Sequence, residues 1–225
     1  VHSRIRDAEV ETTALEKALE LQERIGTKLH VAHLSSKAGL ELVREAKSNG
    51  QNVSCEVTPH HLFLTEKDTE RLGNLGKMNP SLKSREDVNA LWKGLRTGVI
   101  DCIATDHAPH TLEEKSKPYN EAPSGVPGVE TMFPLFLDAV QKEKISLERV
   151  VQCGSENPAR LFDFHDKGAL REGLSADLVL VNPHAQWTVQ GTHFYSKSGW
   201  TPFEGIKLKG TVEQTIVRGR GVFHG

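Results

Sequence analysis

The sequence predicts an α/β protein in which short parallel strands alternate with helices and a β-rich segment follows. In roughly the first half of the chain, helical apolar spacing alternates with short apolar runs. The strand–helix–strand order is the unit that builds parallel sheets. Beyond about Gly168, strand-like runs are separated by Gly, Pro and Asn, which favours a second, β-rich unit.

The first strand–helix–strand unit is expected within the first 57 residues. Apolar or small residues spaced three and four apart predict the opening helix, and two serines offer N-caps for the next one. The expected elements are a helix over 7–24 closed by Gly26, a strand over 29–33, a helix from Ser35–Ser36 to Asn49–Gly50, and a strand over 52–57.

The alternation continues beyond a polar, turn-rich stretch over residues 65–84. The loop over 106–128 contains four prolines and is too long to be a mere connector, so it is a candidate functional loop. The remaining expected elements are helices over 85–98, 130–141, 147–153 and 157–162, and strands over 99–105, 177–181, 186–189 and 211–217.

Composition narrows the possible partners. The 28 Lys and Arg residues against 30 Asp and Glu residues give a formal net charge of -2, which argues against nucleic acid or an anionic membrane. No apolar run approaches the roughly 18 residues of a spanning helix. The three cysteines are widely spaced and form no Cys-x-x-Cys pair, which favours a reducing compartment such as the cytoplasm.

Polar, reactive residues follow each of the three predicted parallel strands. His33 ends the first, His60 and His61 follow the second, and Asp106 follows the third. Ligands and catalytic groups gather at the carboxyl ends of parallel strands, because the following loops converge there. The residues alone therefore predict metal-assisted hydrolysis at this edge of the sheet.

Asp106 and His33 are the strongest candidates in this group. A carboxylate that closes an apolar strand needs a positive partner or a metal, and it suits metal ligation or general-base work. The alternative for Asp106 is a helix N-cap or an ion-paired loop acid, and the alternative for His33 is a structural histidine. His60 and His61 are adjacent, so one is expected to pack below the edge and the other to form a supporting hydrogen bond.

Gly125, Pro127 and Gly128 could bring backbone amides close to an anionic ligand, although ordinary turn usage explains this lone pattern better. No nucleophile elbow surrounds a serine, and no Walker-type phosphate loop is present. Covalent serine chemistry and nucleotide binding are therefore disfavoured.

At these positions the chain resembles the dihydroorotases of the amidohydrolase superfamily, over essentially its whole length. The motifs that carry the resemblance are, in order, His33-Leu-Ser-Ser, Glu56-Val-Thr-Pro-His-His-Leu, Lys77-Met-Asn-Pro, Ala104-Thr-Asp-His-Ala-Pro-His-Thr-Leu-Glu-Glu-Lys, Gly125-Val-Pro-Gly-Val-Glu-Thr and Trp200-Thr-Pro-Phe-Glu-Gly.

The resemblance implies the C-terminal part of a (β/α)8 barrel followed by a small β-sandwich segment. Residues 1–167 would hold barrel strands six to eight with their helices, and residues 168–225 the sandwich segment. The complete site would hold one or two zinc ions, with His33 and Asp106 as metal ligands and Asp106 as the catalytic proton carrier. Asn79, His110, Ser124 and Gly125 would bind the substrate.

The implied reaction is the reversible hydrolysis of dihydroorotate to N-carbamoyl-L-aspartate in pyrimidine biosynthesis. The family's first-strand His-x-His-x-Arg motif, its fourth-strand lysine or aspartate and its fifth-strand histidine are not in this sequence. A (β/α)8 barrel also typically needs about 200 to 250 residues, whereas only three barrel strands are expected here. We therefore expect the chain to be a fragment that is inactive alone.

Two other readings remain open. One is another cyclic amidase, a dihydropyrimidinase or an allantoinase. The other is a non-catalytic, dihydroorotase-like scaffold for aspartate transcarbamoylase, which the retained His33 and Asp106 argue against and the missing ligands favour. The expected partners are the small-molecule substrate and either a second copy of the chain or aspartate transcarbamoylase.

Overall fold

The computed structural model describes residues 7–225, which divide into two compact units. Unit 1 comprises the chain up to Gly128 together with Thr192–Pro202. Unit 2 comprises Val129–Gly191 and Phe203–Gly225. The division lies near Gly128, whereas the boundary expected from the sequence lies after residue 167 and stays a prediction.

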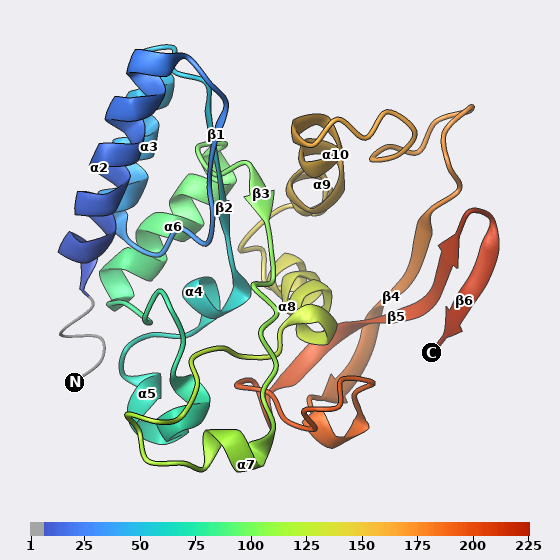
Figure 1. The fold of residues 1–225 in the computed structure, drawn as a ribbon. Coiled ribbons are helices and arrows are strands. Elements are labelled where there is room, and N and C mark those ends of the chain that lie inside the picture. The colour runs from blue at the N-terminus through green and yellow to red at the C-terminus, as the bar shows by residue number, and fades with distance from the viewer. Residues whose placement is uncertain (1–6) are drawn as a thin grey trace. The chain divides into compact units, whose positions relative to one another are not determined.

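Unit 1 is built on a parallel sheet of three strands in the order β1-β2-β3. The strands are β1 (Leu29–Val31), β2 (Val53–Val57) and β3 (Cys102–Ile103). Helices α2 (Ala8–Ile25), α3 (Lys37–Ser48) and α6 (Arg85–Thr97) lie on one side of this sheet (Figure 1). The expected α/β class with parallel strands is confirmed.

The core of unit 1 lies between these helices and one face of the sheet. Val53, Cys55 and Val57 of β2 are buried, whereas the intervening Ser54 and Glu56 are only half-buried. A Cβ atom on Gly94 of α6 would lie 2.8 Å from the Leu40 side chain of α3, so glycine allows these helices to approach closely.

Helix boundaries in unit 1 follow local capping chemistry. Asp7 caps α2, and Gly26 ends it in the left-handed conformation. Ser84 and Asp87 form a reciprocal capping box at the start of α6. The shorter helical elements are α4 (Pro59–Phe63), α5 (Asp68–Leu72), η1 (Gly73–Gly76) and α7 (Leu112–Lys115). The short helix η3 (Gly191–His193) spans the boundary between units 2 and 1 after Gly191.

The structure corrects three sequence-based expectations in unit 1. Strand β1 ends at Val31 rather than at His33, and β3 is limited to two residues of the expected 99–105. His60 and His61 lie on helix α4, which was not among the elements expected after the strand that ends at residue 57. Thr58 caps that helix and Pro59 occupies its first turn, so the chain turns away directly after the strand.

Unit 2 combines helices with an antiparallel sheet of order β4-β5-β6. Helix α8 packs against β5, where the Asp138 carboxylate accepts a hydrogen bond from the Lys209 amide at 3.1 Å. Glycine at position 210 permits this contact, because a Cβ atom there would lie 2.7 Å from Leu137. The elements are α8 (Val129–Gln141), α9 (Leu147–Val151), η2 (Gln152–Glu156), α10 (Asn157–Leu161), β4 (Leu178–Thr188), β5 (Lys207–Val217) and β6 (Arg220–His224).

The antiparallel sheet differs in detail from the expected strands. The predicted strands over 177–181 and 186–189 are joined in the single strand β4, whose register with β5 is irregular between Asn182 and Gln186. Strand β6 was not expected. The sandwich arrangement of this segment stays a prediction.

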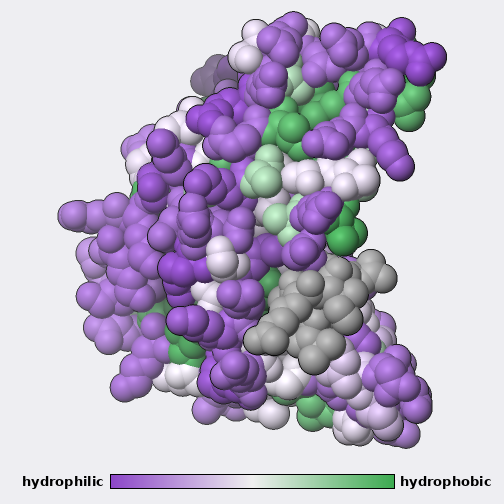
Figure 2. All heavy atoms as spheres, turned by 90° about the vertical axis from the view of Figure 1, so that its left-hand side faces the viewer, coloured by the Kyte–Doolittle hydropathy of each residue, from purple (hydrophilic) through white to green (hydrophobic). Residues whose placement is uncertain are grey.

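The surface that carries α2 is mostly hydrophilic, with hydrophobic atoms in separate groups (Figure 2). Three apolar residues of α2, Val10, Leu21 and Ile25, are exposed. Within residues 7–225, every helix is too short or too polar to cross a membrane.

Candidate functional site

A cavity of about 410 Å³ lies beside β1 in unit 1. Residues of α2 and β1, most of them apolar, line it together with polar residues that include His33, Asn79 and Lys83. Two of the predicted site residues, His33 and Asn79, thus line the same space. The cavity is large enough for a small-molecule ligand.

His33 lies two residues beyond the end of β1, in a turn. Its φ angle of 39° is in the left-handed region, which is uncommon for a residue with a side chain. The His33 amide donates a hydrogen bond to Glu56 Oε1 at 3.4 Å. Its buried Nδ1 atom forms no hydrogen bond, so this nitrogen is available to a ligand.

Asp106 lies three residues beyond the end of β3 and also has a positive φ angle, 45°. Its side chain is half-buried. Burial raises the pKa of Asp106, and the Glu56 charge adds to this effect while the His33 charge opposes it. The charges of His33 and Glu56 both act on Asp106, so the three side chains lie within electrostatic range of one another.

Sequence reasoning missed Glu56 as a member of this cluster. Glu56 lies on the half-buried face of β2, where its Oε2 atom is 3.0 Å from His30 Nε2. His30 Nδ1 is in turn 2.8 Å from Ser54 Oγ. Burial acts to raise the pKa of Glu56, but the hydrogen bonds and charges of His30 and His33 together outweigh it, so the pKa is lowered. The alternation of β2, which places Ser54 and Glu56 on one face, was the available signal.

His60 and His61 are both buried on α4. The His61 ring lies between Thr58 Oγ1, 2.8 Å from Nδ1, and the Pro80 carbonyl, 3.0 Å from Nε2. Because a carbonyl only accepts, Nε2 carries the proton and Nδ1 accepts from the Thr58 hydroxyl. His61 therefore supports the segment next to Asn79, as expected for one of the two histidines, and His60 Nε2 forms no hydrogen bond.

The loop over residues 106–128 holds the other three predicted substrate-binding residues together. His110 Nε2 is 3.2 Å from the Ser124 carbonyl oxygen. A Cβ atom on Gly125 would lie 2.7 Å from the Ala108 carbonyl oxygen, and the φ angle of Gly125 is 133°. Only glycine fits this turn without strain. The Gly125 amide, however, donates to the Lys77 carbonyl at 3.0 Å, so this amide is already engaged within the chain.

The predicted site residues thus form two groups within unit 1. His33 and Asp106 lie with Glu56 at the ends of the strands, and His110, Ser124 and Gly125 lie in the long loop. The segment that contains Asn79 connects the two groups, because Asn79 shares the cavity with His33 and Lys77 holds Gly125. The roles assigned to these residues stay predictions.

The donor set fits part of a metal site. The unoccupied Nδ1 of His33 and the neighbouring Asp106 carboxylate are both suitable zinc ligands. In the part of the chain from residue 7 onward, no group of three or more His, Cys, Asp or Glu side chains is arranged to hold a metal ion. A structural or catalytic zinc site typically uses three or four protein ligands, so further ligands are required.

Comparison with known proteins identifies the family. Residues 5–222 match the model of the amidohydrolase family. The dihydroorotase of Methanosarcina mazei is 44% identical over 99% of this chain and 50% of its own length, and that of Pyrococcus horikoshii is 46% identical over 95% and 49%. Among solved structures, the L-hydantoinase (dihydropyrimidinase) of Arthrobacter aurescens is 37% identical, with a TM-score of 0.92 over 95% of this chain and 49% of that protein.

These matches confirm the resemblance to dihydroorotases that the sequence motifs indicate. The chain spans about half the length of the curated relatives that it matches.

Proposed function

The chain belongs to the amidohydrolase family, and on that premise we propose that it forms the C-terminal portion of a dihydroorotase. The complete protein would interconvert dihydroorotate and N-carbamoyl-L-aspartate in pyrimidine biosynthesis. The observation that carries this proposal is the 42–46% identity to dihydroorotases, in a chain where His33 and Asp106 follow strands β1 and β3 of one parallel sheet.

The proposal includes the architecture of the complete protein. Strands β1 to β3 would be strands six to eight of a (β/α)8 barrel within residues 1–167, and residues 168–225 would form the sandwich segment. The parallel order β1-β2-β3, with helices along one side, supports this assignment. The other barrel strands would come from a part of the protein outside this chain.

His33 and Asp106 would hold zinc together with ligands from that other part. When bound, zinc supplies Lewis-acid polarisation of the ring amide and activation of water. The orphaned Nδ1 of His33 supports this role. Glu56 would keep the His33 turn in place through its contact with the His33 amide.

Asp106 would be the proton carrier of the reaction. In the hydrolytic direction it would accept a proton as water adds to the ring amide carbon. It would then return this proton to the nitrogen that leaves when the C–N bond breaks. Burial raises the pKa of Asp106, which moves the carboxyl closer to the pH at which it must both accept and donate.

Asn79 and His110 would bind the polar groups of the substrate ring and its carboxylate. The ring of His110 is oriented by the Ser124 carbonyl. Because glycine has no side chain, Gly125 would let the loop backbone stay close to Ala108 and would leave the substrate site open.

A second candidate function is hydrolysis of another cyclic amide, as in dihydropyrimidinases, and the similarity to the Arthrobacter aurescens L-hydantoinase favours it. It is the weaker candidate, because the curated dihydroorotases are more similar in sequence. Assays on hydantoin and allantoin beside carbamoyl aspartate separate these activities. A homodimer, association with aspartate transcarbamoylase as a scaffold, and a cytoplasmic location remain predictions.

The test combines zinc analysis with a cyclisation assay on carbamoyl aspartate at mildly acidic pH. The purified chain is measured alone and after mixing with the half of the Methanosarcina mazei dihydroorotase that it does not match. We expect little zinc and no turnover from the chain alone, and both from the mixture.

Asp106→Asn in the mixture should remove turnover, because the amide cannot carry the proton. Asp163→Asn is the matched control, since Asp163 is exposed and also has a positive φ angle, 58°. Turnover by the chain alone would contradict the incomplete-site part of the proposal. Turnover of hydantoin but not of carbamoyl aspartate would replace the dihydroorotase assignment by the second candidate.

A further inference from the structure

Lys115 is a buried lysine that the proposed reaction does not use. The residue is only 2% exposed, although it ends the short helix α7 within the long loop. Among residues 7–225, no carboxylate forms an ion pair with its ammonium group. Burying an ammonium group without a carboxylate is costly, so its hydrogen bonds must compensate.

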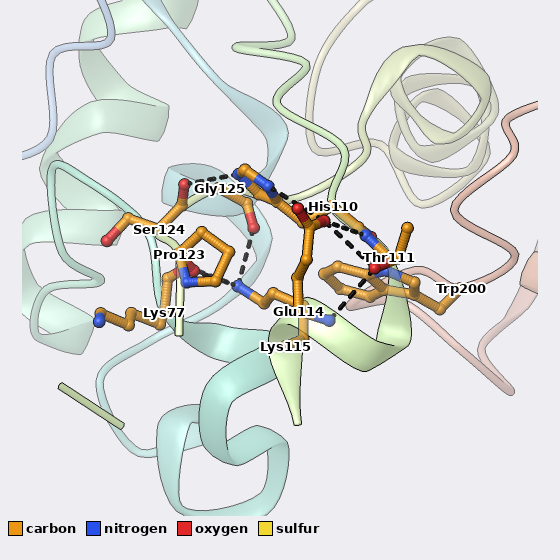
Figure 3. Close-up of polar contacts among 9 residues, drawn as sticks. All are labelled: Lys77, His110, Thr111, Glu114, Lys115, Pro123, Ser124, Gly125 and Trp200. Atoms are coloured by element: carbon orange, nitrogen blue, oxygen red, sulfur yellow. Dashed lines mark hydrogen bonds and ion pairs between the residues drawn. The ribbon is translucent and has the colours of Figure 1, made fainter. Parts of the chain in front are cut away.

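Three backbone carbonyls surround the Lys115 ammonium. The oxygens of Lys77, Pro123 and Gly125 accept hydrogen bonds from Nζ at 3.1, 3.0 and 3.0 Å (Figure 3). An ammonium group has three donors, so all of them are used. Burial and the neighbouring Lys77 charge lower the pKa of Lys115 to about 8.

These bonds surround the Ser124–Gly125 turn, which the proposed function assigns to substrate binding. Pro123 and Gly125 flank Ser124, so the ammonium holds the turn on both sides. The Lys77 carbonyl accepts from both Lys115 Nζ and the Gly125 amide. The turn is thereby fixed to the segment that leads to Asn79, two residues after Lys77.

The other side of Lys115 faces the returning segment of unit 1. The ammonium lies 5.5 Å from the centre of the Trp200 ring, within the range of a cation–π interaction. Trp200 Nε1 donates to the His110 carbonyl at 2.7 Å. Lys115 and Trp200 therefore contact both the turn and the residue that the proposed function assigns to the substrate (Figure 3).

We propose that Lys115 is a positioning residue that holds the Ser124–Gly125 turn and His110 in their substrate-binding arrangement before substrate arrives. This inference rests on the proposed function for its effect on catalysis. A loop over residues 106–128 would otherwise have to be ordered at each binding event, and fixing it in advance removes that entropic cost. Because His110 and the Ser124–Gly125 turn would bind the substrate, whereas Asp106 at the start of the loop would carry the proton, loss of Lys115 should weaken binding more than turnover.

The test compares Lys115→Met with Lys117→Met, which removes the same group from an exposed lysine two residues away. In the active mixture described above, K115M should raise KM about tenfold or more while kcat changes less than about threefold. K115R, which keeps the charge and several donors, should recover part of the loss. K117M should match the unsubstituted protein.

Amide hydrogen exchange on the 225-residue chain gives a second readout that needs no activity. K115M should increase exchange by about tenfold or more within residues 108–128 and leave α3 and α6 unchanged. Wild-type KM and exchange in K115M, or equally faster exchange throughout unit 1, would overturn the proposal. If the mixture is inactive even with the unsubstituted chain, while K115M shows faster exchange confined to this loop, the proposed function is contradicted and the positioning role is supported.

Discussion

Both residues proposed to bind zinc adopt a backbone conformation that ordinary residues avoid. His33 and Asp106 have φ angles of 39° and 45°, at a typical cost of about 1–3 kcal/mol each. Each follows a strand of the same parallel sheet. Such strain persists where surrounding contacts impose it, and it is concentrated at functional sites. The bond from the His33 amide to Glu56 is one such contact.

Residue chemistry also predicts how the stability of the chain depends on pH. Burial, together with the positive charges around it, lowers the pKa of His61 well below its ordinary 6.5. The unfolded chain therefore binds a proton near pH 6.5 that the folded chain does not bind. The contribution of His61 to the free energy of unfolding is fully present above this pH and is lost as the pH falls. His61 should contribute a slope of up to about 1.4 kcal/mol per pH unit.

Urea unfolding between pH 7.5 and 5 measures this slope. His61→Gln should be less stable at neutral pH, because it disturbs the contacts with Thr58 and Pro80, but its stability should fall less steeply with acid. His184→Gln, which removes an exposed histidine, is the control. Equal slopes for H61Q and the unsubstituted chain would show that His61 does not carry this dependence.

At the scale of elements, a carboxylate of α2 fixes the start of α3. Glu11 accepts hydrogen bonds from the amides of Ser35 and Ser36 at 3.0 and 3.1 Å, and also from both serine hydroxyls. Ser36 is itself the N-cap of α3, so Glu11 adds negative charge at a helix N-terminus. The loop that leads from His33 into α3 is thereby anchored to α2.

Glu11→Gln should destabilise the chain by about 1–3 kcal/mol, because the side-chain amide places N–H groups against donors that need acceptors. Chemical denaturation measures the difference. Glu16→Gln, on the exposed side of the same helix, should change stability by less than about 0.5 kcal/mol. A loss in E16Q as large as in E11Q would assign the effect to α2 itself rather than to its contact with α3.

Elements with strong local signals were the predictable ones. The helix expected over 85–98 is observed as Arg85–Thr97, because its capping box and left-handed Gly98 are encoded locally. Strand β3 is much shorter than expected, since ladder pairing with β2 rather than apolar character sets its ends. Helix α4 was missed because a five-residue helix carries too little periodicity to be recognised.

At the scale of the whole molecule, the sequence predicted which residues lie at the strand ends but not how they are held. His33 and Asp106 could be selected because reactive residues follow apolar runs. Lys115 could not, because its partners are backbone carbonyls from residues 77 to 125. Backbone acceptors leave no pattern in side-chain chemistry, so only the folded chain reveals them.

The division into two units predicts that the chain unfolds in more than one step. Each unit has its own buried side chains, among them Leu95 in unit 1 and Phe136 in unit 2, which are 0% and 1% exposed. Two cores of this kind need not lose their packing together, so the van't Hoff enthalpy should be smaller than the calorimetric enthalpy. Leu95→Ala and Phe136→Ala should each cost about 2–5 kcal/mol in their own unit.

Differential scanning calorimetry should therefore show two components that the variants shift separately. L95A should lower only the transition of unit 1, and F136A only that of unit 2. Leu112→Ala and Leu170→Ala are the matched controls, because these leucines are 52% and 88% exposed in units 1 and 2. A single sharp transition that both core variants lower equally would mean that the two units fold as one cooperative body. A substitution that destabilises either unit would then also destabilise the loop over residues 106–128 that Lys115 holds.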